Sequence, residues 1–193
     1  MVVAAAATAW FVVGGGNPLA QVADFSFEFG KVGGSAVAER APEAELQDAA
    51  EQVRDTLDEM YLVGFVDHTR WEGGTFPDLY GAFTDDLEGK VRRDLPNLSL
   101  GADAARIDSV DPISGRLSVR FLVNEESEPI AATAHAVFAA NALATDGGNV
   151  AIQHDGTYYM EPEEDGWLIG AYEVKGIVTR VDQPLADPQA APA

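Results

Sequence analysis

Apolar positions in the first third of the chain repeat at helical spacing. Between residues 43 and 63 an apolar side chain recurs at every third or fourth position, and charged or amide side chains fill the opposite positions. This period predicts an amphipathic helix that packs on an apolar surface. Pro42 marks its start and Gly64 its end. Shorter helical segments are predicted within 76–95, where Pro96 ends the last one.

The spacing changes from helical to alternating after residue 105. From there apolar side chains occupy every second position, which is the period of a strand with one buried face. Clusters rich in Gly, Pro, Asn, Asp and Glu interrupt the alternation and predict turns. The pattern predicts five strands, at 105–110, 117–124, 130–143, 150–160 and 167–174, with a reverse turn at 111–115 between the first two.

Helices followed by strands joined through short turns predict one α+β domain over residues 43–176. Its N-terminal helices should pack on a curved antiparallel β-sheet, because neither part can bury its apolar face without the other. The Pro- and Ala-rich segment 177–193 is expected to be a disordered tail.

The N-terminal region differs from this domain in composition. Residues 1–16 carry no charged side chain, and they suggest an anchor or signal remnant, although the run is short for a membrane span and no basic residues precede it. A mobile or locally packed tail is the alternative. Residues 17–42 are expected to be a linker or arm. Within it Phe25, Phe27 and Phe29 would share one face of a strand, either laid on the domain or presented to a partner.

Net charge restricts the possible partners. The chain has 32 acidic against 12 basic residues, and its net charge is −20. Such a field repels phosphate backbones and anionic lipid surfaces, so nucleic acid is not an expected partner. The absence of cysteine excludes disulfides, thiolate metal ligands and thiol nucleophiles.

The order of elements over 43–175 resembles the nuclear transport factor 2-like superfamily. The resemblance is carried by the long first helix, the short helices at 76–95 and the closing strand DGWLIGAY at 165–172. It implies a cone of helices cupped by a bent sheet, with a pocket inside and a possible homodimer through the sheet. The apolar N-terminus is similar to that of actinobacterial Mce-associated membrane proteins, whose anchor is longer and follows basic residues.

The resemblance directs attention to side chains that could line the interior of the cone. The expected pocket residues are Tyr61, Trp71, Phe83, Phe121, His135 and Trp167. If the domain is an enzyme, the candidate acids and bases are His135, His154, Asp155 and Tyr158. The strand register places residue 135 opposite 158 or 159, and residue 154 opposite 140, so the two histidines should not form a metal site.

Other polar motifs have weaker support. Asp67 and His68 are adjacent and point in different directions, so a catalytic dyad is not expected there. The acidic turns at 125–128 and 161–165 lack the ligand spacing of a calcium loop and are interpreted as solvated hairpin tips. The sequence therefore predicts no metal and no cofactor.

Three functions remain open. The sequence favours a non-catalytic binding or assembly domain, anchored at or secreted across the cell envelope, which binds other envelope proteins or a small apolar ligand. One alternative is a small enzyme of the isomerase, dehydratase or hydrolase type with a pocket in the cone. The other is a cytoplasmic ligand-binding module.

Overall fold

The computed structural model describes residues 25–34, 43–71, 74–164 and 166–185. The apolar run at 1–16 lies outside these residues, as does the end of the expected tail, 186–193. Among the helices of the described residues, none is both long and apolar enough to cross a membrane.

The first helix, α1 (Glu43–Tyr61), is the amphipathic helix that the sequence predicts. Its buried side includes Val53 and Leu57, which are fully buried. The helix continues into one π-helical turn, η2 (Leu62–Val66). Gly64 is required in this turn by a close approach, since a Cβ there would come within 2.8 Å of the Leu98 carbonyl oxygen.

Short helical turns connect α1 to a second helix. The 3-10 turns η3 (His68–Arg70), η4 (Pro77–Ala82) and η5 (Asp85–Leu87) precede α2 (Glu88–Leu98), and η6 (Gly101–Arg106) follows it.

Pro96 lies inside the last turn of α2, so the prediction that it ends the helix is wrong. A proline in the last turn removes only one backbone donor. The Ser99 hydroxyl donates to the Leu95 carbonyl oxygen at 2.8 Å, which supplies a partner at this end of α2.

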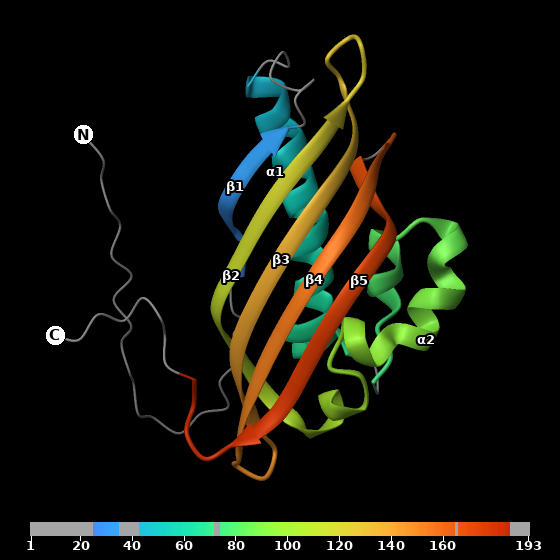
Figure 1. Cartoon of the computed structure of the whole chain (residues 1–193). Helices are drawn as coiled ribbons and strands as arrows, with labels where there is room; N and C mark the ends of the chain where they lie inside the picture. Colours follow the sequence, from blue (N-terminus) through green and yellow to red (C-terminus); the bar gives the residue numbers. More distant parts are fainter. Residues whose placement is uncertain (1–24, 35–42, 72–73, 165, 186–193) are drawn as a thin grey trace, which may run out of the picture.

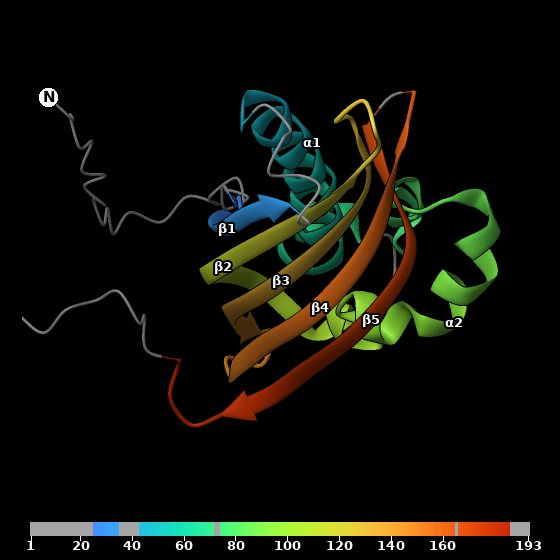
Figure 2. The same cartoon turned by 45° about the horizontal axis from the view of Figure 1, so that its top comes forward.

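The described strands form one five-stranded sheet whose order follows the chain (Figure 1). The strands are β1 (Glu28–Gly34), β2 (Ile107–Val123), β3 (Pro129–Ala144), β4 (Asn149–Glu163) and β5 (Gly166–Val181). Strands β2 to β5 form the predicted antiparallel meander, whereas β1 pairs in parallel with β2. The sheet is curved, and both α1 and α2 lie on the same side of it (Figure 2). The predicted α+β class, with helices packed on a curved sheet, is confirmed.

Two details of the sheet differ from the prediction. The reverse turn expected at 111–115 lies inside β2, which contains register irregularities beside Ile107, Pro112 and Leu122. Strand β1 pairs only with residues 116–121 of β2, so Pro112 faces no strand of the described chain on its other side and its missing N–H is tolerated. The final strand also continues to Val181, through the domain boundary that the sequence suggested at 176.

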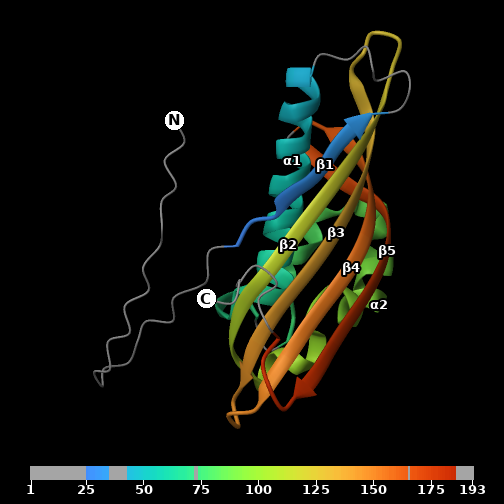
Figure 3. The ribbon, with the colours of Figure 1, turned by 60° about the vertical axis from the view of Figure 1, so that its left-hand side comes forward.

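The fifth strand comes from the N-terminal arm instead. Figure 3 shows β1 beside β2 at the edge of the sheet, next to α1. Phe27 is buried at 3% exposure, and Phe25 and Phe29 are partly buried against the core. The phenylalanine rings of the arm therefore pack on the domain, which was the first of the two expectations for this segment. We call the sheet face that carries the helices the inner face and the opposite one the outer face.

Candidate functional site

The pocket residues that the sequence suggested separate onto the two faces of the sheet. The aromatic ones are buried in the core, with exposures from 0% to 9%: Tyr61, Trp71, Phe83, Phe121 and Trp167. His135 is on the outer face, where 49% of its side chain is exposed. Side chains alternate along β3, so its even-numbered residues face the helices and His135 points away from them.

Two of the candidate acids and bases, His154 and Tyr158, are buried and connected through Tyr61. The Tyr158 and Tyr61 hydroxyl oxygens are 3.2 Å apart, and the Tyr61 hydroxyl is 2.7 Å from His154 Nδ1. His154 Nε2 is 2.8 Å from the carbonyl oxygen of Asn97, the residue that follows Pro96 in α2. We call these four groups the buried hydrogen-bond chain.

The chemistry of its ends fixes the direction of every bond in this chain. A carbonyl oxygen can only accept, so His154 Nε2 carries the proton and donates to Asn97. His154 Nδ1 is then an acceptor, which receives the Tyr61 hydroxyl proton. The Tyr61 oxygen in turn accepts from Tyr158. Each member thus has a partner although it is withdrawn from water.

Burial also shifts the acidity of these groups. Desolvation lowers the pKa of His154 to about 4, although the Asn97 hydrogen bond and the charge of Asp155 act in the opposite direction. Burial raises the pKa of both Tyr61 and Tyr158 above the ordinary tyrosine value. The side chains of the buried hydrogen-bond chain are therefore all neutral at physiological pH.

The other two candidates meet on the outer face. His135 Nε2 is 3.0 Å from Asp155 Oδ1, and both side chains are about half exposed or more. The register places His135 opposite Thr157, and His154 opposite Phe138. The two histidines are therefore on opposite faces, and His135 with Asp155 does not join His154 with Tyr158.

The Asp67 carboxylate is engaged next to its own turn. Its Oδ1 accepts from the Thr69 backbone N–H at 3.0 Å and from the Thr69 hydroxyl at 2.5 Å. The ring of His68 lies instead near Trp71, with ring centroids 6.3 Å apart. This turn is therefore an ordinary capped turn.

An open cleft of about 1040 Å³ lies between α1, η4 and the turn that joins β4 to β5. Its polar lining has five carboxylates and one guanidinium: Asp55, Glu59, Asp78, Glu163, Glu164 and Arg70. Its apolar lining includes Met60, Pro77, Ala82, Trp167 and Leu168. We call this site the acidic cleft.

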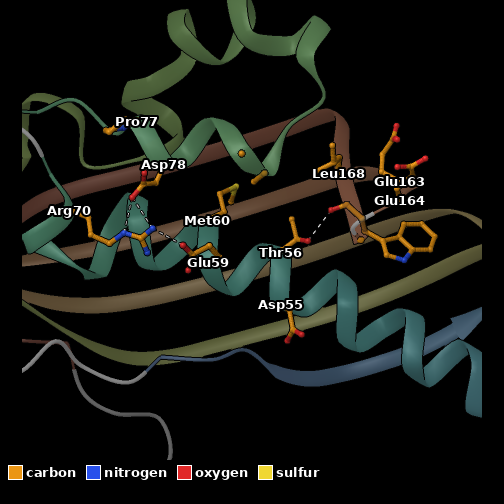
Figure 4. Close-up of a pocket in the computed structure, with 14 residues that line it drawn as sticks. Asp55, Thr56, Glu59, Met60, Arg70, Pro77, Asp78, Glu163, Glu164 and Leu168 are labelled. Atoms are coloured by element: carbon orange, nitrogen blue, oxygen red, sulfur yellow. Dashed lines mark hydrogen bonds and ion pairs between the residues drawn. The ribbon is translucent and has the colours of Figure 1, made fainter.

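Charges are distributed unevenly along the acidic cleft (Figure 4). Arg70 lies toward one end, where it donates to Glu59 at 2.6 Å and to Asp78 at 2.9 Å. Hydrogen bonding to Glu59, followed by that to Asp78, raises the pKa of Arg70. Glu163 and Glu164 lie toward the other end, and neither has an ion-pair partner among the described residues.

The floor of the acidic cleft is held by a contact between α1 and β5. The Thr56 hydroxyl donates to the Trp167 carbonyl oxygen at 2.9 Å. Between the two ends the lining mixes the apolar Met60 on α1 and Leu168 on β5 with Asp55 and Thr56. This arrangement suits a ligand with cationic groups attached to an apolar stem.

The sequence suggested Trp167 for a pocket inside the cone and did not predict the acidic cleft. The sequence placed Asp55 on the polar face of the first helix, and Glu163 and Glu164 in a solvated hairpin tip. These carboxylates are more than 100 positions apart along the chain. The clustering of acidic residues was the available signal, but nothing in their spacing predicts that the two segments meet.

Within the described part of the chain, no group of three or more His, Asp or Glu side chains is arranged to hold a metal ion.

Comparisons with known proteins give the chain no family by sequence. No family model matches it, and no curated protein sequence matches it. The solved structures that match it include the following two. One is described as a candidate aromatic ring hydroxylase from Novosphingobium aromaticivorans, with 12% identity, a TM-score of 0.43 and coverage of 70% of this chain and 94% of that one. The other is a hexachlorocyclohexane dehydrochlorinase (LinA, type 2), with 12% identity, a TM-score of 0.38 and coverage of 76% and 97%. Likeness at this level carries no inference about activity.

Proposed function

We propose that the chain is a non-catalytic binding domain with the architecture of the nuclear transport factor 2-like superfamily, and that its acidic cleft takes a basic segment of a partner protein. The observation that carries this proposal is the composition of the cleft, in which five carboxylates face a single arginine. Two of these carboxylates, Glu163 and Glu164, have no basic partner among the described residues. A Lys- or Arg-containing segment would supply the missing charges.

The size and shape of the acidic cleft favour a peptide segment over a small molecule. Its volume of about 1040 Å³ is at the upper limit of ordinary small-ligand pockets, which is roughly 1,000 Å³, and it is open to solvent. The stems of Lys and Arg side chains can lie along Pro77 and Leu168 while their charged ends reach the carboxylates. Because the carboxylates are exposed, they should mainly accelerate association and make it sensitive to salt.

A fluorescent oligoarginine peptide tests this proposal by anisotropy titration at low and moderate salt. The double variant Glu163→Gln/Glu164→Gln should weaken binding by about two- to thirtyfold, since each of the two exposed charge pairs contributes roughly 0.2 to 1 kcal/mol. The matched control is Asp108→Asn/Asp111→Asn, which removes two exposed carboxylates from β2, outside the cleft lining. Equal weakening by both double variants would mean that the peptide follows net charge alone, and the proposal would fail.

A small enzyme is the second candidate function. The observation in its favour is the buried hydrogen-bond chain, which aligns two hydroxyls and an imidazole in one direction. For catalysis a reactant would have to reach Tyr158 or His154, whose exposures are 0% and 2%. The arrangement therefore supports binding better than catalysis.

The cellular location is proposed from the sequence. The uncharged run at 1–16 supports a place at the cell envelope, either anchored or secreted. Fractionation of cells that express the natural gene tests this, and recovery of the protein in the cytosol alone would favour the cytoplasmic module.

A further inference from the structure

The N-terminal arm enters the domain as a bound peptide would. Its strand β1 adds to the edge of β2, and just before it two phenylalanine rings reach into the inner side of the sheet. The Phe27 ring meets the Tyr61 ring edge-on at 4.7 Å, and the Phe25 ring meets the Phe138 ring edge-on at 5.1 Å. Strand addition combined with pockets for alternate side chains is a common mode of peptide recognition.

The opposite strand has a gap for these two rings. A Cβ on Gly115 of β2 would come within 2.7 Å of the Phe25 ring and within 3.1 Å of the Phe27 ring. Only glycine leaves the rings enough room at this position. Gly115 therefore belongs to a slot for the arm, which we call the aromatic slot and define by Gly115, Tyr61 and Phe138.

A carboxylate on α1 holds the backbone of the arm. Asp58 Oδ1 accepts the Phe27 backbone N–H at 2.8 Å, and Oδ2 accepts the Ser26 hydroxyl at 2.5 Å. Partial burial of the carboxylate raises the pKa of Asp58, and these two hydrogen bonds offset only part of that rise. The arm is thus held by one side chain and an edge strand, and it can leave without breaking the pairing among β2, β3, β4 and β5.

The arm covers the buried hydrogen-bond chain. Tyr61, whose ring contacts Phe27, donates its hydroxyl proton to His154, and Phe65 lies against both Tyr61 and His154. Withdrawal of the Phe25 and Phe27 rings would therefore leave an apolar cavity walled by aromatic rings. Cavities of this kind stay dry and bind small aromatic compounds.

We infer that residues 25–34 are a tethered plug that fills an aromatic-ligand site in the cone, and that a planar apolar ligand of one or two rings competes with Phe25 and Phe27 for the aromatic slot. The acidic cleft plays no part in this inference. In the structure the arm is docked, so the protein's own Phe25 and Phe27 rings occupy the aromatic slot.

Indole is the probe for this site, and the full chain is the protein tested by calorimetric titration and thermal shift. Phe25→Ala/Phe27→Ala removes the plug rings and should bind indole about tenfold or more tighter than the unsubstituted protein. The matched control is Phe29→Ala, on the same arm, whose ring lies by Arg54 outside the slot. It should bind indole as weakly as the unsubstituted protein does.

A second variant expels the plug without removing its rings. Asp58→Ala removes the carboxylate that accepts the Phe27 backbone N–H and the Ser26 hydroxyl and leaves the aromatic slot unchanged, so it should release the arm, raise indole affinity in the same direction and expose residues 25–34 to limited proteolysis. A synthetic peptide with the sequence of residues 25–34, added to Phe25→Ala/Phe27→Ala, should displace indole. Equal indole affinity in the unsubstituted protein and both plug variants would overturn the inference. Absence of indole binding by plug variants that remain folded, as judged by circular dichroism, would overturn it too.

Discussion

The two sides of α1 border regions with opposite construction. On one side Tyr61 belongs to the buried hydrogen-bond chain, where each hydroxyl and ring nitrogen has a hydrogen-bond partner within the protein. On the other side Asp55 and Glu59 line the acidic cleft, where carboxylates outnumber their basic partners. One helix thus borders both regions, but only in the first are the polar groups all paired within the protein.

This difference separates stability from binding. Groups that are buried and fully paired contribute to the free energy of unfolding, and breaking one pair leaves the other partner unsatisfied. Exposed carboxylates contribute little to folding, since surface ion pairs are worth about 0 to 1 kcal/mol. Substitutions in the aromatic region should therefore change stability, whereas substitutions in the acidic cleft should change affinity.

The largest effect is expected from Phe138→Ala. Phe138 is 1% exposed, and its ring lies near the rings of Phe25, Tyr61 and Phe65. Truncating it leaves a cavity, so the free energy of unfolding should fall by about 3 to 5 kcal/mol in urea titrations. The control is Val137→Ala, the next residue on β3, which is 41% exposed on the outer face and should cost about 1 kcal/mol or less. Similar losses in both variants would contradict the assignment of the faces.

The next effect is the pH dependence caused by His154. Burial lowers its pKa from 6.5 to about 4, so the folded protein holds the neutral ring while the unfolded chain takes up a proton near pH 6.5. The stabilisation is complete above that pH and is lost as the pH falls from 6.5 to about 4, by roughly 3 kcal/mol at about 1.4 kcal/mol per pKa unit.

Urea unfolding at a series of pH values checks this expectation with His154→Gln, which should flatten the decline. The exposed His135→Gln is the control and should leave it intact. Asp58 acts in the opposite direction, because its raised pKa favours the folded state as the pH falls. Comparing variants at each pH removes that contribution. A decline that is as steep in His154→Gln as in the unsubstituted protein would refute the expectation.

A smaller loss is expected from Tyr61→Phe. The ring stays in place, but His154 Nδ1 loses its donor and the Tyr158 hydroxyl loses its acceptor. Leaving buried polar groups unpaired should cost about 1 to 3 kcal/mol in thermal or urea unfolding. Tyr159→Phe removes the same atom from an exposed tyrosine on the outer face and should change stability by about 0.5 kcal/mol or less. No difference between the two variants would mean that the buried hydrogen-bond chain adds nothing to folding.

How far the sequence predicted this molecule depends on the range of the interactions concerned. The period of apolar side chains predicted α1 and the antiparallel meander, because burial on one face acts through the local repeat. Pro112 and Gly115 were mistaken for a turn because their local preference is real, but long-range contacts override it. Gly115 is needed for the Phe25 ring, which lies far away in the sequence.

The candidate sites were predicted less well for the same reason. Both tyrosines and His154 of the buried hydrogen-bond chain could be named from the sequence, but the strand register was shifted by one or two positions. His135 looked equivalent to His154, and only the observed register separates the two faces. The acidic cleft forms where α1 lies close to the turn between β4 and β5, and no local sequence pattern predicts that these two segments are neighbours.

Arg70→Gln should have the smallest effect on stability and the most informative effect on binding. The Arg70 side chain is partly exposed and its partners Glu59 and Asp78 are more than half exposed, so its loss should cost about 1 kcal/mol or less. Yet the guanidinium already satisfies two carboxylates of the acidic cleft, and its removal frees both for a ligand. Affinity for oligoarginine at low salt should therefore rise about threefold or more.

Arg180→Gln is the control for this last comparison. Arg180 pairs with Asp146 at 2.7 Å in another part of the molecule, so the variant changes net charge equally without touching the acidic cleft. Anisotropy titrations should show a rise in affinity for Arg70→Gln alone. An equal rise in both variants would reduce the acidic cleft to a share of the overall charge. A fall in affinity for Arg70→Gln would contradict the idea that Arg70 competes with the peptide for Glu59 and Asp78. It would mean instead that Arg70 helps to form the binding surface.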